Sequence, residues 1–176
     1  MPVAFSRYAD ARVDVVVPTK RYKKPQICYV LRGLQGSGKT FYVEYLKELG
    51  LIYDYFEADQ DMYNEDGEYE YDRSKVFQAH KNCRARAICA LNEGKDIALS
   101  NTFVALWQLK PYLDYCKNNG ILVKIISLYD GGFTDKELAE KRNQHGVDEN
   151  TIAKFREQWE PDILNGNPVN PYIKSS

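Results

Sequence analysis

One eight-residue stretch restricts the fold of this chain more than any other feature. Gly33-Leu-Gln-Gly-Ser-Gly-Lys39-Thr40 matches the pattern G-x-x-x-x-G-K-[ST]. It follows the apolar run Gln26–Arg32, which is typical of a buried strand, and leads into a helical pattern over Gly38–Leu49. In that setting the glycines let successive backbone N–H groups turn inward and form an anion cradle at the helix N-terminus. The motif therefore predicts a loop that binds a nucleoside triphosphate.

The residue types inside the motif predict individual roles. Lys39 places a cation against the β- and γ-phosphates, and the Thr40 hydroxyl can ligate Mg²⁺. The other predicted nucleotide-binding positions are Gly33, Gly36, Ser37 and Gly38. ATP and Mg²⁺ are the expected ligands, and a glycine-rich turn with a surface lysine is the alternative interpretation.

Apolar strand patterns alternate with helical patterns through the rest of the chain, which predicts βαβ units and a parallel sheet covered on both faces. The further strands are expected at Ile52–Phe56, Ile97–Ser100 and Ile121–Leu128, and a weak one at Val13–Val17. Helices are expected at Asp72–Gly94, Trp107–Asn119, Thr134–Arg142 and after Asp148. Thr134-Asp-Lys-Glu137 has the form of a capping box, and Asp148 is expected to cap the last helix. We expect one α/β domain over residues 26–160, an N-terminal extension at 1–25 and a tail at 161–176.

Composition excludes several classes of protein. The chain has 176 residues, with 24 Lys and Arg against 25 Asp and Glu, and its net charge of −1 argues against a generally basic nucleic-acid-coating protein. No run approaches the ~18 apolar residues of a membrane span, and the N-terminus does not resemble a secretory signal. The four cysteines lack metal-ligand spacing and lie in apolar segments, where we expect them to be buried. A cytoplasmic location (the host cytoplasm for a viral protein) is therefore expected.

The ends of the second and third strands carry the candidates for acceptor chemistry, because ligands in such folds sit at the carboxyl ends of the strands. Asp59 follows the second strand, where a carboxylate could accept the proton of an attacking hydroxyl. The alternative interpretation of Asp59 is a solvated carboxylate. Asp61 is a second, weaker candidate for the residue that accepts the proton. Asn101 and Thr102 follow the third strand.

From Gln26 to Trp159 the chain resembles the bacteriophage-type polynucleotide 5′-hydroxyl kinases and related small P-loop kinases. The resemblance lies in an ordered series of segments: GLQGSGKT, EADQDM, Gly67-x-Tyr-x-Tyr-Asp72 with Ala79-His80-x-x-Cys83, SNTFVALW with Lys110-Pro-Tyr112, and ELAEKRNQHGV. It implies a three-layer α/β/α fold with a mostly parallel sheet of four to five strands and a short helical lid at about 130–147. It also implies transfer of the γ-phosphate of ATP to the 5′-hydroxyl of a polynucleotide, with single-stranded or terminal nucleic acid as partner.

Within this resemblance Asp59 matches the general base and Arg142 matches a lid arginine that reaches the donor phosphates; a surface arginine is the alternative for Arg142. Three positions depart from the family pattern. Met62 stands where an arginine holds the substrate phosphate, Asn101 where a strand-end aspartate is expected, and His145 near a second lid arginine.

These departures keep two alternatives open: a kinase of a nucleoside, small metabolite or modified DNA base, and a non-enzymatic ATP-dependent binding module. The candidate substrate-binding residues are Asp61, Asn101, Thr102 and His145.

Three further features have ordinary structural interpretations. Residues 54–72 carry nine carboxylates and no basic side chain, which indicates a solvated acidic loop that repels polyanions. His80 lies on the apolar stripe of its helix, so we expect it in the core. Trp107 with Tyr112 and Tyr115 could stack on a base, although ordinary packing explains them as well.

Overall fold

The computed structural model of the protein describes residues 24–142 and 144–161. The strand expected at Val13–Val17, nearly all of the N-terminal extension and the tail after residue 161 lie outside the described residues. Lys24, the first described residue, forms an ion pair with Asp96, with its ammonium 2.9 Å from Oδ2.

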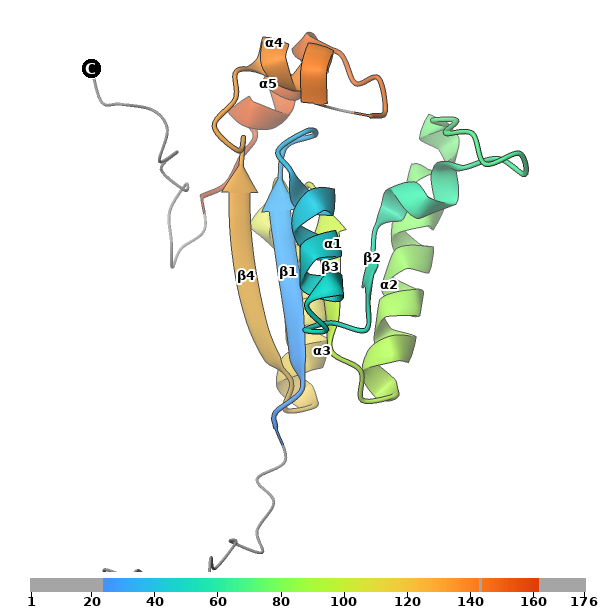
Figure 1. The fold of residues 1–176 in the computed structure, drawn as a ribbon, viewed down its shortest axis with the longest axis vertical. Helices are drawn as coiled ribbons and strands as arrows, with labels where there is room; N and C mark the ends of the chain where they lie inside the picture. The colour runs from blue at the N-terminus through green and yellow to red at the C-terminus, as the bar shows by residue number, and fades with distance from the viewer. Residues whose placement is uncertain (1–23, 143, 162–176) are drawn as a thin grey trace, which may run out of the picture.

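Four parallel strands form a central sheet in the order β2-β3-β1-β4 (Figure 1). The strands are β1 (Ile27–Gly33), β2 (Asp54–Phe56), β3 (Ile97–Asn101) and β4 (Leu122–Tyr129). All seven residues of β1 are buried, because β1 pairs with β3 on one side and β4 on the other. The expected buried strand before the glycine-rich loop is thereby confirmed.

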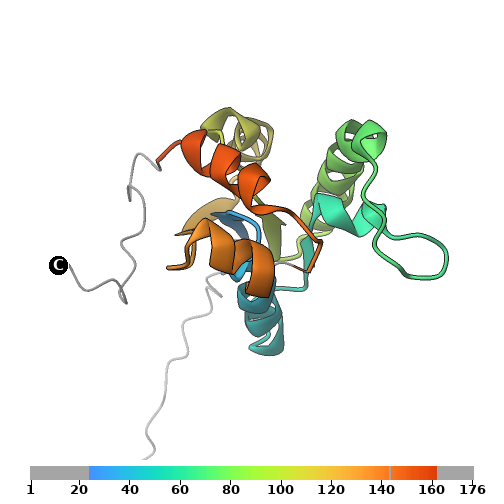
Figure 2. The same cartoon turned by 90° about the horizontal axis from the view of Figure 1, so that it is seen from above.

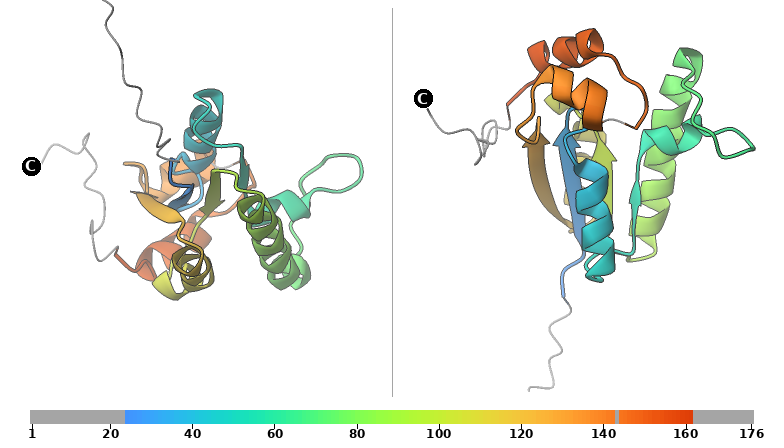
Figure 3. Two further views of the ribbon diagram at one scale, coloured as in Figure 1. Left: turned by 90° about the horizontal axis from the view of Figure 1, so that it is seen from below. Right: turned by 45° about the horizontal axis from the view of Figure 1, so that its top comes forward.

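Helices cover both faces of this sheet (Figures 2 and 3). They are α1 (Lys39–Glu48) on one face, and α2 (Val76–Asn92) and α3 (Lys110–Asn118) on the other. Successive side chains of a strand point to opposite faces. Accordingly, Tyr29 and Leu31 pack on the α1 side, whereas Cys28 and Val30 pack against α2 and α3. The predicted three-layer α/β/α fold is confirmed.

Short helical segments occupy the connections at the C-terminal ends of the strands. The 3₁₀ turns are η1 (Ala58–Met62), η2 (Arg73–Lys75) and η3 (Leu106–Gln108). After β4 come α4 (Asp135–Glu137), the π-helical η4 (Leu138–Arg142) and α5 (Glu149–Glu157), which lie above the ends of β1 and β4 (Figure 1). A separate apolar cluster joins these helices to the glycine-rich loop through Leu34, Leu138, Ile152 and Trp159.

The predicted helix caps are confirmed, since Thr134 Oγ1 accepts from Glu137 N–H at 3.3 Å and Asp148 Oδ1 from Thr151 N–H at 3.0 Å. The expectation of a core histidine is wrong, because His80 is exposed. Ala79 and Cys83 make the buried face of α2, and His80 is turned about 100° from Ala79 around the helix axis.

Two smaller findings complete the fold. Cys89 is exposed on α2, contrary to the expectation that all four cysteines are buried; the other three are buried. Among residues 24–142 and 144–161, no helix combines the length and the apolar character that a membrane crossing would require.

Candidate active site

The loop between β1 and α1 has the backbone geometry that a phosphate cradle needs. Gly36 and Gly38 have φ angles of 76° and 103°, which L-residues with a side chain rarely adopt. Gly38 is also the N-cap of α1, so the positive end of that helix opens into the loop. Inside the loop the Ser37 hydroxyl is buried and has no hydrogen-bond partner among the described residues.

Lys39 folds back across this loop. Its ammonium donates to the carbonyl oxygens of Gly33 at 2.8 Å and Leu34 at 2.9 Å. Burial lowers the pKa of Lys39 to about 8, while the nearby carboxylates of Glu57 and Asp59 act in the opposite direction. The lysine is therefore enclosed, and it lies within electrostatic reach of both strand-end carboxylates.

Glu57 faces the start of α1 from the end of β2. The Thr40 hydroxyl donates to Glu57 Oε1 at 3.2 Å. Burial raises the pKa of Glu57, and Ser100, Lys39 and Thr40 partly offset that rise. The sequence argument gave Glu57 no role. The available signal was its position directly after the second strand, where ligands of such folds bind.

Asp59 lies two residues further on, within η1, and its side chain is half exposed at 49%. His145 Nε2 is 3.8 Å from Asp59 Oδ2, and the Tyr69 hydroxyl lies 3.5 Å from Oδ1. The rings of Tyr69 and His145 are stacked with centroids 4.0 Å apart. Asp59 is thus bordered by an aromatic and an imidazole ring and remains open to solvent.

The other polar residues near the strand ends make contacts within the protein. Asp61 forms an ion pair with Arg86 of α2 and accepts from the Asn82 amide at 2.7 Å. Asn101 is only 8% exposed, and its Oδ1 accepts from the backbone N–H of Ala58 at 2.9 Å. The carbonyl oxygen of Thr102 accepts from Gly33 N–H at 3.1 Å. Asn101 therefore holds η1 against β3.

Arg142 reaches the phosphate cradle from η4. Its Nε donates to the carbonyl oxygen of Gly36 at 3.0 Å, and its guanidinium lies over the Phe133 ring at 4.2 Å. An added Cβ at Gly38 would lie 3.7 Å from Arg142 Nη2. The arginine that the sequence placed on the lid therefore lies directly beside the loop.

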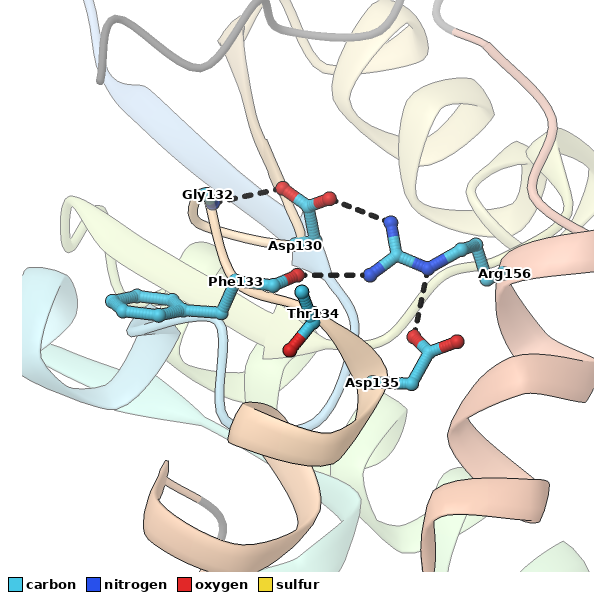
Figure 4. A pocket seen from close by; sticks show the side chains of 6 residues that line it. All are labelled: Asp130, Gly132, Phe133, Thr134, Asp135 and Arg156. Atoms are coloured by element: carbon cyan, nitrogen blue, oxygen red, sulfur yellow. Dashed lines mark hydrogen bonds and ion pairs between the residues drawn. The ribbon is translucent and has the colours of Figure 1, made fainter. Parts of the chain in front are cut away.

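A second arginine, Arg156, holds the turn that carries Phe133 (Figure 4). Arg156 of α5 donates from Nη1 to Asp130 at 2.6 Å, from Nε to Asp135 at 2.7 Å and from Nη2 to the Phe133 carbonyl at 3.0 Å. One planar guanidinium thus joins the end of β4, the turn after it and the start of α4. No sequence pattern indicated this contact.

Of the three aromatic residues suggested as a stacking surface, Tyr112 is buried on α3, Tyr115 is partly buried and donates its hydroxyl to Asn92 Oδ1, and Trp107 is 72% exposed. A stacking surface that includes Tyr112 is therefore ruled out. The aromatic side chains near Asp59 come instead from the acidic loop: Tyr69 beside the carboxylate, Tyr63 packed edge-on against Tyr69, and the exposed Tyr71.

The residues present fit a magnesium–nucleotide complex. A loop with glycines at positive φ, a lysine enclosed by it and an unpartnered buried hydroxyl on Ser37 supply donors for phosphate oxygens. The Thr40 hydroxyl and the Glu57 carboxylate supply oxygen ligands, which Mg²⁺ prefers.

Comparisons with known proteins bear on the family and the fold of the chain. A family model described as an AAA domain matches residues 29–161. NEDD4-binding protein 2 of Homo sapiens is 30% identical over 157 residues, in an alignment that covers 86% of this chain and 8% of that protein.

Two solved structures, of a Pnkp1/Rnl/Hen1 complex and of the Pnkp1/Rnl/Hen1 RNA repair complex, share the fold at 15% identity. Their TM-scores are 0.55 and 0.60, over 69% and 81% of this chain and 40% and 46% of theirs. The chain thus spans less than half of each relative, and the structural likeness concerns the fold alone.

Proposed function

This chain belongs to the AAA domain family of P-loop kinase-like proteins, and from that premise we propose that it is an ATP-dependent phosphotransferase acting on the 5′-hydroxyl of a polynucleotide. The fold supports nucleotide-related phosphotransfer in general. The acceptor, the site residues and the cofactors are parts of the proposal.

The observation that carries the proposal is the position of Asp59. Its carboxylate lies within electrostatic reach of Lys39 in the cradle, yet half of its side chain remains open to solvent. A carboxylate beside the donor phosphates and accessible from outside can meet a hydroxyl carried by a separate substrate.

In the proposed reaction Asp59 accepts the proton of the acceptor hydroxyl as its oxygen bonds to the γ-phosphorus. The bond from that phosphorus to the β–γ bridging oxygen breaks, and ADP leaves. Lys39, the backbone of Gly33, Gly36 and Gly38, and Ser37 would hold the phosphates, while Thr40 would hold the Mg²⁺. When bound, the metal supplies positive charge that neutralises the phosphate oxygens. Orientation and electrostatic stabilisation account for most catalysis in such reactions.

Arg142 is assigned to the transferring phosphate. It already lies at the Gly36 carbonyl, and its guanidinium is held over Phe133. A positive, planar group at this position can stabilise charge on the γ-phosphate in the transition state. Residues 130–147 would then act as the lid of a kinase domain at 26–160, between the extension at 1–25 and the tail at 161–176.

A polynucleotide acceptor is favoured by the surroundings of Asp59. The carboxylate is open rather than enclosed, and Tyr63 and Tyr71 are exposed on the neighbouring loop, where bases of a strand could stack. The structural neighbours from an RNA repair complex support the same acceptor class. The free thiols favour a reducing compartment, so the cytoplasm is the proposed location.

A small acceptor is the second candidate, and Met62 favours it. At the position where the related kinases carry a phosphate-holding arginine, Met62 is buried in an apolar cluster with Ala58, Ala79 and Cys83. A nucleoside, small metabolite or modified base would not need that arginine. A non-enzymatic ATP-dependent binding module is the third interpretation.

Transfer of labelled γ-phosphate tests the proposal. Wild-type protein and Lys39→Met are incubated with ATP, Mg²⁺ and either 5′-hydroxyl oligonucleotides or a panel of nucleosides. We expect labelled oligonucleotide with the wild type only. Label on nucleosides alone would establish the small-acceptor function. ATP binding without transfer to any acceptor would exclude both kinase functions and support the non-enzymatic binding module.

A further inference from the structure

The end of β3 supplies no carboxylate to the cradle. Asn101 is buried there, and its side-chain oxygen is occupied by the Ala58 N–H at 2.9 Å. The preceding residue, Ser100, is also neutral and only 3% exposed. A divalent cation beside the Thr40 hydroxyl would therefore receive no charged oxygen from this strand.

The carboxylate beside the Thr40 hydroxyl comes instead from Glu57, which directly follows the neighbouring strand β2. Its Oε1 lies 3.2 Å from the Thr40 hydroxyl, and Lys39 is close enough to influence its protonation. The Ser100 hydroxyl is also close enough to lower the pKa of Glu57, although its oxygen has no partner in ordinary hydrogen-bond geometry among the described residues. Glu57 thus lies between the ends of α1 and β3, with a buried hydroxyl left unpartnered beside it.

The two strand-end carboxylates have different neighbours. Glu57 faces Thr40 and Ser100, on the nucleotide side, whereas Asp59 faces Tyr69 and His145. Only Asp59 is therefore placed for the acceptor. A carboxylate next to a P-loop hydroxyl has the chemistry of a hard-cation ligand, because Mg²⁺ in phosphate sites is held by one or two carboxylates together with the phosphates.

We propose that Glu57, together with Thr40, holds the divalent cation that accompanies the bound nucleotide, in place of a carboxylate at the end of β3. This proposal rests on the proposed function, since it requires that a nucleotide binds in the cradle. It divides the strand-end carboxylates into a metal-side residue, Glu57, and an acceptor-side residue, Asp59.

A purely structural role for Glu57 makes a different prediction. If the carboxylate only held the start of η1 in place, its loss would weaken nucleotide binding equally with and without metal. If it holds the cation, its loss would reduce only the part of the affinity that depends on metal.

The test is calorimetric titration of ATP into the full chain without acceptor, once with Mg²⁺ and once with EDTA, and the quantity compared is the ratio of the two Kd values. We expect Glu57→Gln to reduce the Mg²⁺-dependent gain about tenfold or more and to leave metal-free binding equal or tighter. Thr40→Ala is the positive control. Asp59→Asn should leave the ratio unchanged, and Glu48→Gln, which removes an exposed charge at the end of α1, should change neither value.

An unchanged ratio in Glu57→Gln would overturn the proposal, as would an equal loss in Asp59→Asn. Circular dichroism melts of each variant identify any loss of fold. If wild-type protein bound no ATP under either condition, the proposed function would fail as well. Metal-dependent ATP binding that is unaffected by Glu57→Gln would overturn the proposal for Glu57 and leave the proposed function standing.

Discussion

Burial decides the chemistry of single residues at this site, and Lys39 is the clearest case. Its amine is enclosed by the loop, so desolvation lowers its pKa to about 8, and the free protein loses this charge as the pH rises past that value. A bound triphosphate favours the charged form. The proposed binding of ATP would therefore take up a proton above pH 8.

We accordingly expect the affinity for ATP to fall by up to about tenfold per pH unit above pH 8. Isothermal titration between pH 7.5 and 9.5 measures this slope. Lys39→Met should bind more weakly at pH 7.5 and show no such slope. A parallel decline in that variant would assign the titration to another group.

Asp59 supports a prediction about the chemical step. Asp59→Asn keeps the size of the side chain but removes its capacity to accept a proton. We expect phosphate transfer to fall by about a hundredfold or more, with the Kd of ATP within about threefold of the wild type because Asp59 does not line the phosphate loop. Transfer assays and equilibrium titrations on the same preparation measure both values. Full activity in this variant would exclude Asp59 as the base.

At the scale of elements, short segments anchored at both ends position the reactive groups. The three-residue strand β2 leads directly into η1, and the buried Asn101 fixes Ala58 between Glu57 and Asp59. Because the intervening residue is held, the two carboxylates keep different directions. A single side-chain amide from β3 therefore helps determine the geometry of the site.

The segment after β4 depends similarly on Arg156, which donates to two carboxylates and one carbonyl oxygen. We expect Arg156→Gln to lower the free energy of unfolding by about 2 kcal/mol, since it leaves Asp130 and Asp135 partly buried without their cation. Lys136→Gln, which breaks only the exposed 4.0 Å pair with Glu140, should cost less than about 0.5 kcal/mol. Urea denaturation measures both, and equal losses would contradict a special role for Arg156.

At the scale of the whole molecule, the near-zero net charge is the sum of acidic and basic side chains that are concentrated in different parts of the sequence. The carboxylates of residues 54–72 are partly neutralised by bases from elsewhere, as in the pairs Asp54–Lys47 and Asp61–Arg86. The acidic loop beyond them carries the exposed side chains Glu65, Asp66 and Glu68. A nucleic acid would have to approach Asp59 from a direction that avoids this loop.

Within the part of the chain that the structure describes, the four clusters of buried apolar residues lie between Ile27 and Trp159. We therefore expect a protein shortened to residues 24–161 to unfold cooperatively, with a Tm within about 3 °C of the full chain, and to bind ATP equally well. Differential scanning calorimetry measures the Tm. A decrease of more than about 10 °C would show that the flanking residues stabilise the domain.

The amino-acid sequence by itself determined the glycine-rich loop between strand and helix, the succession of strands and helices along the chain, and the caps at Thr134 and Asp148. These features depend on neighbours within a few residues: glycines at positive φ, apolar periodicity and side chains that accept from nearby N–H groups. The same local logic misplaced His80, because one position on a helix is enough to turn a side chain out of the core.

Only the tertiary structure decided which groups meet at the site. Thr40 contacts Glu57 across 17 positions of the chain, and Arg142 reaches Gly36 across 106. Such contacts follow from how β2 lies beside β3 and how η4 packs over the loop, and no local pattern encodes them. The physical reason is that these residues are far apart in the sequence and meet only through the packing of the sheet and its helices, so the role proposed for Glu57 became visible only in the folded chain.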